Sequence, residues 1–256
     1  MTAPEDAPFE PVTTPEDTIR VDRRYNGPPN SANGGYISGL VAPRARRMLE
    51  SEGDLVVQLH SPPPLDTDLR LTRAGRRVHV WHGGILVATA SPETPGADTP
   101  EAIAPDVAEQ AMLGYEGQGA ANPFPTCFVC GPDHPEGLRL APGPVPGLGD
   151  HVACVWTPEA VTEELVWAAL DCPGGWTLDP LRSPLVLGRM SARITALPLV
   201  GETVIAVGRG MPGEGRVHTC TTALFRRDGT ELARSTATWV RLAPTESLQD
   251  TKAENS

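Results

Sequence analysis

The sequence predicts an α+β protein in which one unit, a helix followed by an antiparallel meander of strands, occurs twice. Helical periodicity gives way to strand-like alternation in the same order in both halves of the chain. Residues repeat as well, since AGRRVHV and ILVATAS in the first half correspond to EGRVHTC and ELARSTA in the second. The 28 prolines and 26 glycines favour short strands joined by turns over long helices.

The first helix is expected to begin at Asn33, because asparagine is a good N-cap and apolar residues follow from Tyr36 at helical spacing. Pro43 lies within this pattern and is expected to kink or break the helix, since it removes a backbone hydrogen bond. Four strands are then expected, LVVQLHS from Leu55, LRLTR from Leu69, VHVWHG from Val78 and ILVATAS from Ile85.

In the second half, Thr157 and Pro158 form a helix start, with an apolar pattern that runs to Asp171 and is ended by CPGGW. Four more strands are expected, RMSARITA from Arg189, TVIAVGRG from Thr203, VHTCTTALF from Val217 and ELARSTATWV from Glu231. Between the last two, RDGT is a strong hairpin turn. The expected division is 10–92 and 127–242 for the two units, 93–126 for a linker with a short helix around residues 107–112, and 243–256 for a disordered tail.

Composition excludes several classes of function. The formal net charge of -11 argues against nucleic acid or an anionic membrane surface as a partner. The amino terminus is acidic where a signal peptide is basic, no stretch reaches membrane-spanning length, and five cysteines are an odd number, so a cytoplasmic protein with reduced thiols is expected. No GxSxG, phosphate-binding loop or dinucleotide fingerprint is present.

NGGYISGLVA, the strand with LHS, the PPPL connection, GRRVHVWHGG and ILVATAS resemble the amino-terminal half of the double hot-dog acyl-CoA thioesterase II family. ALDCPGG and GTELARSTATWV are similar to the central helix and last hairpin of the same superfamily. The resemblance implies two tandem hot-dog domains, an acyl-CoA or other acyl-thioester ligand bound between them, and thioester hydrolysis without a cofactor. Because a duplicated chain is already a pseudo-dimer, a monomer and a homo-oligomer are both compatible with it.

The resemblance also implies site residues. The helix amino terminus would bind the thioester carbonyl, so Asn33, Gly34, Gly35 and Tyr36 are substrate-binding candidates, because free amides stabilise a developing oxyanion. The alternative is that the two glycines only let the helix pack closely. Asp171 occupies the position of the family's catalytic aspartate and is the candidate general base or nucleophile. Its alternative role is to end the helix by binding backbone amides of CPGG.

Two further positions depart from the family pattern. The family uses a threonine and a glutamine beside the aspartate, and our alignment places Leu187 and Ala237 there. Thr236, Thr238 or Ser191 could substitute if the register is shifted. A catalytically silent acyl-thioester-binding protein is therefore the alternative function.

CFVC, where Cys127 and Cys130 are followed by His134, is a candidate metal site. One CxxC supplies two ligands and structural zinc takes four, so no metal is expected and a packing role is favoured. The remaining cysteines, Cys154, Cys172 and Cys220, stand in apolar contexts typical of a protein core. A Cys172 nucleophile was considered, but no neighbouring histidine supports it.

Overall fold

A computed structural model describes residues 18–96, 98–119, 121–213 and 215–242. The strands in chain order are β1 (Thr18–Arg20), β2 (Leu55–Leu59), β3 (Asp68–Ala74), β4 (Arg77–His82), β5 (Ile85–Pro92), β6 (Gly143–Pro144), β7 (His151–Trp156), β8 (Leu185–Ile194), β9 (Val204–Gly210), β10 (Val217–Arg226) and β11 (Glu231–Arg241). The α-helices are α1 (Gly34–Leu49), α2 (Pro105–Met112) and α3 (Glu163–Trp176). The expected tail, 243–256, lies outside the described residues.

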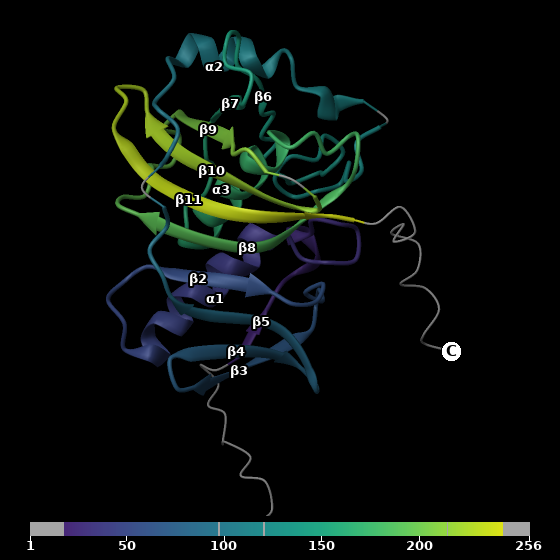
Figure 1. Cartoon of the computed structure of the whole chain (residues 1–256), viewed down its shortest axis with the longest axis vertical. Helices are drawn as coiled ribbons and strands as arrows, with labels where there is room; N and C mark the ends of the chain where they lie inside the picture. The colour runs from purple at the N-terminus through teal and green to yellow at the C-terminus, as the bar shows by residue number, and fades with distance from the viewer. Residues whose placement is uncertain (1–17, 97, 120, 214, 243–256) are drawn as a thin grey trace, which may run out of the picture.

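All the strands form one antiparallel sheet in the order β1-β3-β4-β5-β2-β8-β11-β10-β9-β7-β6. The order is symmetric about the β2–β8 pair. On one side of this pair the strands run β2-β5-β4-β3-β1, and on the other they run β8-β11-β10-β9-β7, with β6 added at the edge. Figure 1 shows the two sets one above the other, with α1 and α3 behind the sheet. The eight strands predicted after the two helices are present, and the structure adds β1, β6 and β7.

Two salt bridges cross the pair that joins the halves. Arg193 of β8 binds Asp54, with its Nε 2.8 Å from the carboxylate, and Arg189 binds Glu93. In the register of the pair, Leu55 lies opposite Ala192 and Gln58 opposite Arg189. These contacts join the two halves at the centre of the sheet, where α1 packs on both β2 and β8.

Helix α1 begins where the sequence predicts. The Asn33 side chain caps it by accepting from the Tyr36 amide at 2.9 Å. The expected break at Pro43 is wrong, since the helix continues to Leu49. Val41, Ala42 and Ala45 are fully buried around the proline, and this packing holds the helix across the missing hydrogen bond.

Helix α3 differs more from the prediction. It begins after Thr162, whose hydroxyl accepts from the Leu165 amide, and not at Thr157, whose hydroxyl bonds that of Thr203. It also continues beyond Asp171 through the CPGGW segment to Trp176, so Asp171 lies inside the helix. The two glycines are there for close packing: a Cβ at Gly174 would lie 2.4 Å from the Cys220 sulfur, and one at Gly175 would lie 2.8 Å from the Trp239 ring.

The segment expected to be a linker contains the predicted short helix, α2, and this helix is packed. Alternate residues of β9 face opposite sides of the sheet: Val204 and Ala206 belong to the core around α1 and α3, while Ile205 and Val207 pack with Ala108 of α2. The outer part of the carboxy-terminal half of the sheet, formed by β7, β9 and β10, is therefore covered on both faces, with α2 outermost in Figure 1.

Candidate active site

Helices α1 and α3 pack directly against each other through glycines of α1. A Cβ at Gly39 would lie 2.5 Å from the Glu164 Cα, and one at Gly35 would lie 2.6 Å from both the Asp171 Cβ and the Trp167 carbonyl oxygen. Only glycine permits this approach, which brings the start of α1 against the middle of α3. Asp171 and Asn33, which are 138 residues apart in the chain, meet there.

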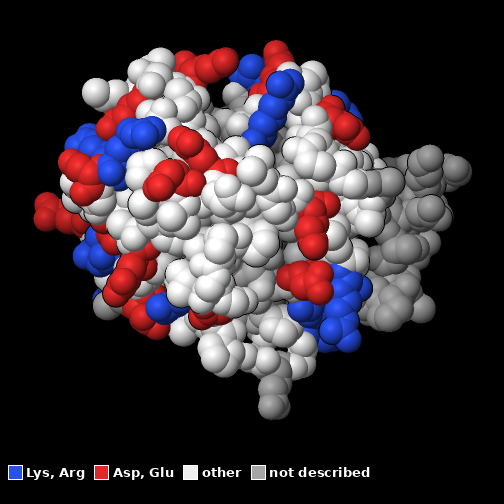
Figure 2. All heavy atoms as spheres, turned by 90° about the horizontal axis from the view of Figure 1, so that it is seen from above, with Lys and Arg blue, Asp and Glu red and all other residues white. Residues whose placement is uncertain are grey.

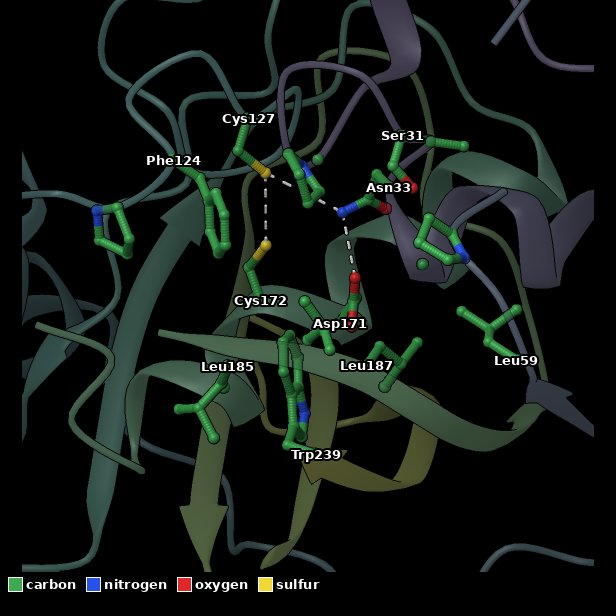
Figure 3. Close-up of a pocket in the computed structure, with 18 of the residues that line it drawn as sticks. Ser31, Asn33, Leu59, Phe124, Cys127, Asp171, Cys172, Leu185, Leu187 and Trp239 are labelled. Carbon is green, nitrogen blue, oxygen red and sulfur yellow. Dashed lines mark hydrogen bonds between the residues drawn. The ribbon is translucent and has the colours of Figure 1, made fainter. Parts of the chain in front are cut away.

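A cavity of about 730 Å³ opens beside this contact (Figure 3). Asn33, Gly34 and Asp171 line it together with the loop that carries Cys127 and Cys130. Much of the rest of the wall is apolar, formed by Leu59, Phe124, Leu185, Leu187 and Trp239. A largely apolar cavity with a few polar groups at one point is typical of a small-molecule site.

The cap fixes the orientation of the Asn33 amide. Since its Oδ1 accepts from the Tyr36 amide, its Nδ2 is directed at Asp171 and donates to Oδ2 of that carboxyl group at 3.0 Å. The same nitrogen lies 4.0 Å from the sulfur of Cys127. Asn33 is therefore both a helix cap and the group that holds Asp171.

Asp171 is 1% exposed, and its two carboxyl oxygens have different surroundings. Oδ2 accepts hydrogen bonds from Asn33 and from the backbone amide of Gly35, the latter at 3.0 Å, whereas Oδ1 has no partner among the described residues. Burial raises the pKa of this carboxyl group to about 7, although the bonds from Gly35 and Asn33 lower it. A carboxyl group held at one oxygen and unpaired at the other suits proton transfer near neutral pH.

The other predicted substrate-binding residues differ in whether their backbone amides are available to a ligand. No described residue accepts a hydrogen bond from the Gly34 amide, and this residue lines the cavity. The Gly35 amide is already bound to Asp171, and the Tyr36 amide to Asn33. The Tyr36 ring stacks on Tyr25, 3.8 Å between centroids, and is not part of the cavity wall.

Of the residues at the two departing positions, one lines the cavity beside the aspartate and the other does not line the cavity. Leu187 lines the cavity and packs against Gly34, whose Cβ would lie 2.8 Å from the leucine Cβ, and Figure 3 shows it beside Asp171. Ala237 is buried on β11 opposite Cys220, whose pKa is raised by burial and by the Asp171 charge. Neither side chain offers a hydrogen-bonding group to Asp171.

The three substitutes considered do not replace them. Ser191, Thr236 and Thr238 are absent from the cavity wall. Thr236 and Thr238 alternate with Ala237 along β11 and so point to the opposite face, where Thr236 accepts from the Gly96 amide at 3.0 Å. None of the three therefore supplies a hydroxyl group to the cavity wall beside Asp171.

Three thiols meet at the wall of the cavity. Cys127 and Cys130 come from the CxxC loop and Cys172 from α3, and their sulfurs all lie within 4.8 Å of one another. Hydrogen bonds from the Cys130 and Cys172 thiols lower the pKa of Cys127. Hydrogen bonds with Cys127 and Cys130 raise the pKa of Cys172. The sequence points to Cys127 and Cys130 through their CxxC spacing, but not to Cys172, which is 45 residues from Cys127.

His134 is not part of the cluster. Its Nε2 lies 2.7 Å from the Arg24 carbonyl oxygen and its Nδ1 accepts from the Glu136 amide at 3.1 Å, so both ring nitrogens are used. The ring also packs edge-on against Phe128. His134 thus holds the cysteine loop against the first half of the chain.

Comparison with solved structures identifies the fold. A protein of unknown function from Alicyclobacillus acidocaldarius, described as having a hot-dog fold, matches with a TM-score of 0.54 and 15% identity over 89% of this chain and 93% of that one. The chain has the hot-dog fold. An acyl-CoA thioesterase II from Mycobacterium marinum matches this hot-dog chain with a TM-score of 0.53 and 14% identity, over 89% and 93% of the two chains.

A third hot-dog structure contains a ligand. The dehydratase domain of PpsC from Mycobacterium tuberculosis, solved with C12:1-CoA, matches with a TM-score of 0.52 and 13% identity over 90% of this chain and 97% of that one. No protein-family model and no curated protein sequence matches the chain. The resemblance to hot-dog thioesterases seen in the sequence is thereby confirmed for the fold.

On the face shown in Figure 2, acidic and basic side chains are interspersed and do not gather into a basic patch. Within the described part of the chain, the helices are all too short or too polar to cross a bilayer.

Proposed function

We propose that this protein hydrolyses an acyl thioester, acyl-CoA being the first candidate, with Asp171 as general base. The observation that carries the proposal is the unpaired Oδ1 of a buried carboxyl group at the wall of a largely apolar cavity. Asn33 and Gly35 hold the other oxygen, so the side chain is fixed without being neutralised by a cation. The thioester carbonyl would accept from the Gly34 amide at the start of α1, where the helix dipole favours negative charge.

The symmetric strand order supports a finer assignment of the fold. We assign residues 10–92 and 127–242 to two tandem hot-dog units, joined by the segment 93–126 that carries α2. In this assignment the cavity lies between the units, because Asn33 belongs to the first and Asp171 to the second. The proposed ligand would then contact both units, in a protein active in the cytoplasm.

The alternative is a protein that binds an acyl thioester without hydrolysing it, and the apolar wall around Asp171 favours this alternative. Leu187 and Ala237 give an attacking water no hydrogen-bonding partner. A protein with this site would bind acyl-CoA and release no thiol.

Thiol release from short, medium, long and aromatic acyl-CoAs separates the two proposals when the binding of each ligand is measured beside it. Release above the uncatalysed rate supports the hydrolase. Binding without release supports the silent protein, and neither binding nor release would contradict both.

The Leu187→Thr variant is expected to raise the turnover number by about fivefold. A hydroxyl group beside Asp171 can orient water, and one hydrogen bond is worth about 1 kcal/mol, which corresponds to a factor of that size. Leu185→Thr, on the same strand and cavity wall, is the matched control and is expected to leave turnover within about twofold. Equal effects of the two substitutions would contradict a specific role for the position beside Asp171.

A further inference from the structure

The cluster of Cys127, Cys130 and Cys172 has no role in the proposed hydrolysis. The three residues are 4%, 8% and 6% exposed, and all three line the cavity. Cys154 and Cys220 are buried too, but they do not belong to this cluster. Core packing is enough to explain a single buried thiol. Three buried thiols that converge from two distant segments are instead the arrangement expected of a set of metal ligands.

The distances suit a tetrahedral metal ion. With zinc–sulfur bonds of about 2.3 Å, two thiolates of a tetrahedral site lie about 3.8 Å apart. The sulfurs of Cys127 and Cys172 are 3.9 Å apart, and no pair in the cluster exceeds 4.8 Å. Small rotations of the side chains would bring all three to one ion.

The loop that carries Cys127 and Cys130 also has a conformation that suits metal binding. The Gly131 amide donates to the Cys127 carbonyl at 2.8 Å, and a Cβ at Gly131 would lie 2.4 Å from the Cys127 nitrogen, so only glycine fits this tight turn. Tyr115 holds the loop from outside by donating to the Cys130 carbonyl at 2.7 Å.

We infer that Cys127, Cys130 and Cys172 form a binding site for a zinc ion, with the fourth coordination position facing the cavity. Three protein ligands and one open position are the arrangement of zinc sites that bind a water molecule or a substrate. His134 cannot complete the set, since Arg24 and Glu136 occupy its ring nitrogens. The fourth ligand is therefore water or a thiol that enters the cavity, and soft sulfur donors suit a site of this kind.

This inference replaces the expectation of no metal, which rested on the two ligands of the CxxC alone. The third ligand comes from the helix that carries Asp171, one residue further along. Zinc binding does not depend on the proposed hydrolysis, and it is measured without a thioester.

The test uses the full chain, purified under reducing conditions and stripped of metal with a chelator. Wild type is expected to bind one zinc ion per chain and to give a sulfur-to-cobalt charge-transfer band when Co²⁺ is added instead. Cys127→Ala and Cys172→Ala are expected to weaken zinc binding by at least about 100-fold, because loss of a ligand exceeds the effect of losing an outer contact. Cys154→Ala, at a buried position on β7, is the matched control and should bind as wild type does.

Alkylation of the wild-type chain keeps the test decisive if a variant does not fold. Zinc is expected to protect Cys127, Cys130 and Cys172 from a thiol reagent in partly unfolded protein and to leave Cys154 and Cys220 unprotected. Folded wild type that binds no zinc and shows no cobalt band would overturn the inference. So would Cys172→Ala that binds zinc as tightly as wild type, because the CxxC alone would then hold the ion.

Discussion

Asp171→Asn is expected to lower thiol release from acyl-CoA by at least about 100-fold, the smallest loss typical of removing a general base. The replacement has nearly the same shape, and its amide oxygen can still accept from Asn33 and Gly35 at the Oδ2 position. The amide nitrogen would take the place of Oδ1, which has no partner to lose among the described residues. The variant therefore removes the proton acceptor and keeps the contacts that hold the helices together.

Thiol release should be measured with the acyl-CoA that wild type cleaves fastest, and binding of the same ligand should be measured in parallel. Asp106→Asn, on the exposed start of α2 across the sheet, is the matched control and should not change the rate. An Asp171→Asn variant that folds, binds the ligand and turns over at the wild-type rate would contradict the assignment of the base. Loss of binding together with turnover would instead assign Asp171 to the ligand contact.

Local patterns predicted much of the fold. Asn33 was identified as a cap because capping depends on the residue itself and its near neighbours, and the RDGT hairpin has the expected Arg226–Thr230 backbone bond, with Gly229 at a φ of 87°. The end of α3 was missed for the opposite reason. Its glycines look like a helix stop in sequence, but they are required by Cys220 and Trp239, which come later in the chain.

The candidate site was predicted residue by residue but not as an arrangement. Asn33 and Asp171 were each singled out, yet their contact depends on the joining of β2 to β8, which no local pattern encodes. Of the cysteine cluster, the CxxC pair is visible in the sequence, but the third member is not, because Cys172 looks like any small apolar residue of a helix. Contacts between distant segments are set by the packing of whole elements.

Gly35→Ala is expected to disrupt both stability and the site. The added methyl group would lie 2.6 Å from the Asp171 Cβ and from the Trp167 carbonyl oxygen, and neither is the flexible end of a side chain. Overpacking of this kind costs about 1–3 kcal/mol of unfolding free energy. The helices would have to move apart, which lengthens the 3.0 Å bond from the Gly35 amide to Asp171.

We therefore expect Gly35→Ala to lower the free energy of unfolding by about 2 kcal/mol and to lower turnover with it. Chemical denaturation measures the first effect and thiol release the second. Gly84→Ala, in the turn between β4 and β5 where a Cβ would meet nothing within 4 Å, is the matched control and should change neither. If Gly35→Ala were as stable as Gly84→Ala, the direct packing of α1 on α3 at this residue would be wrong. The explanation of how the fold holds Asp171 against the amino terminus of α1 would then be wrong as well.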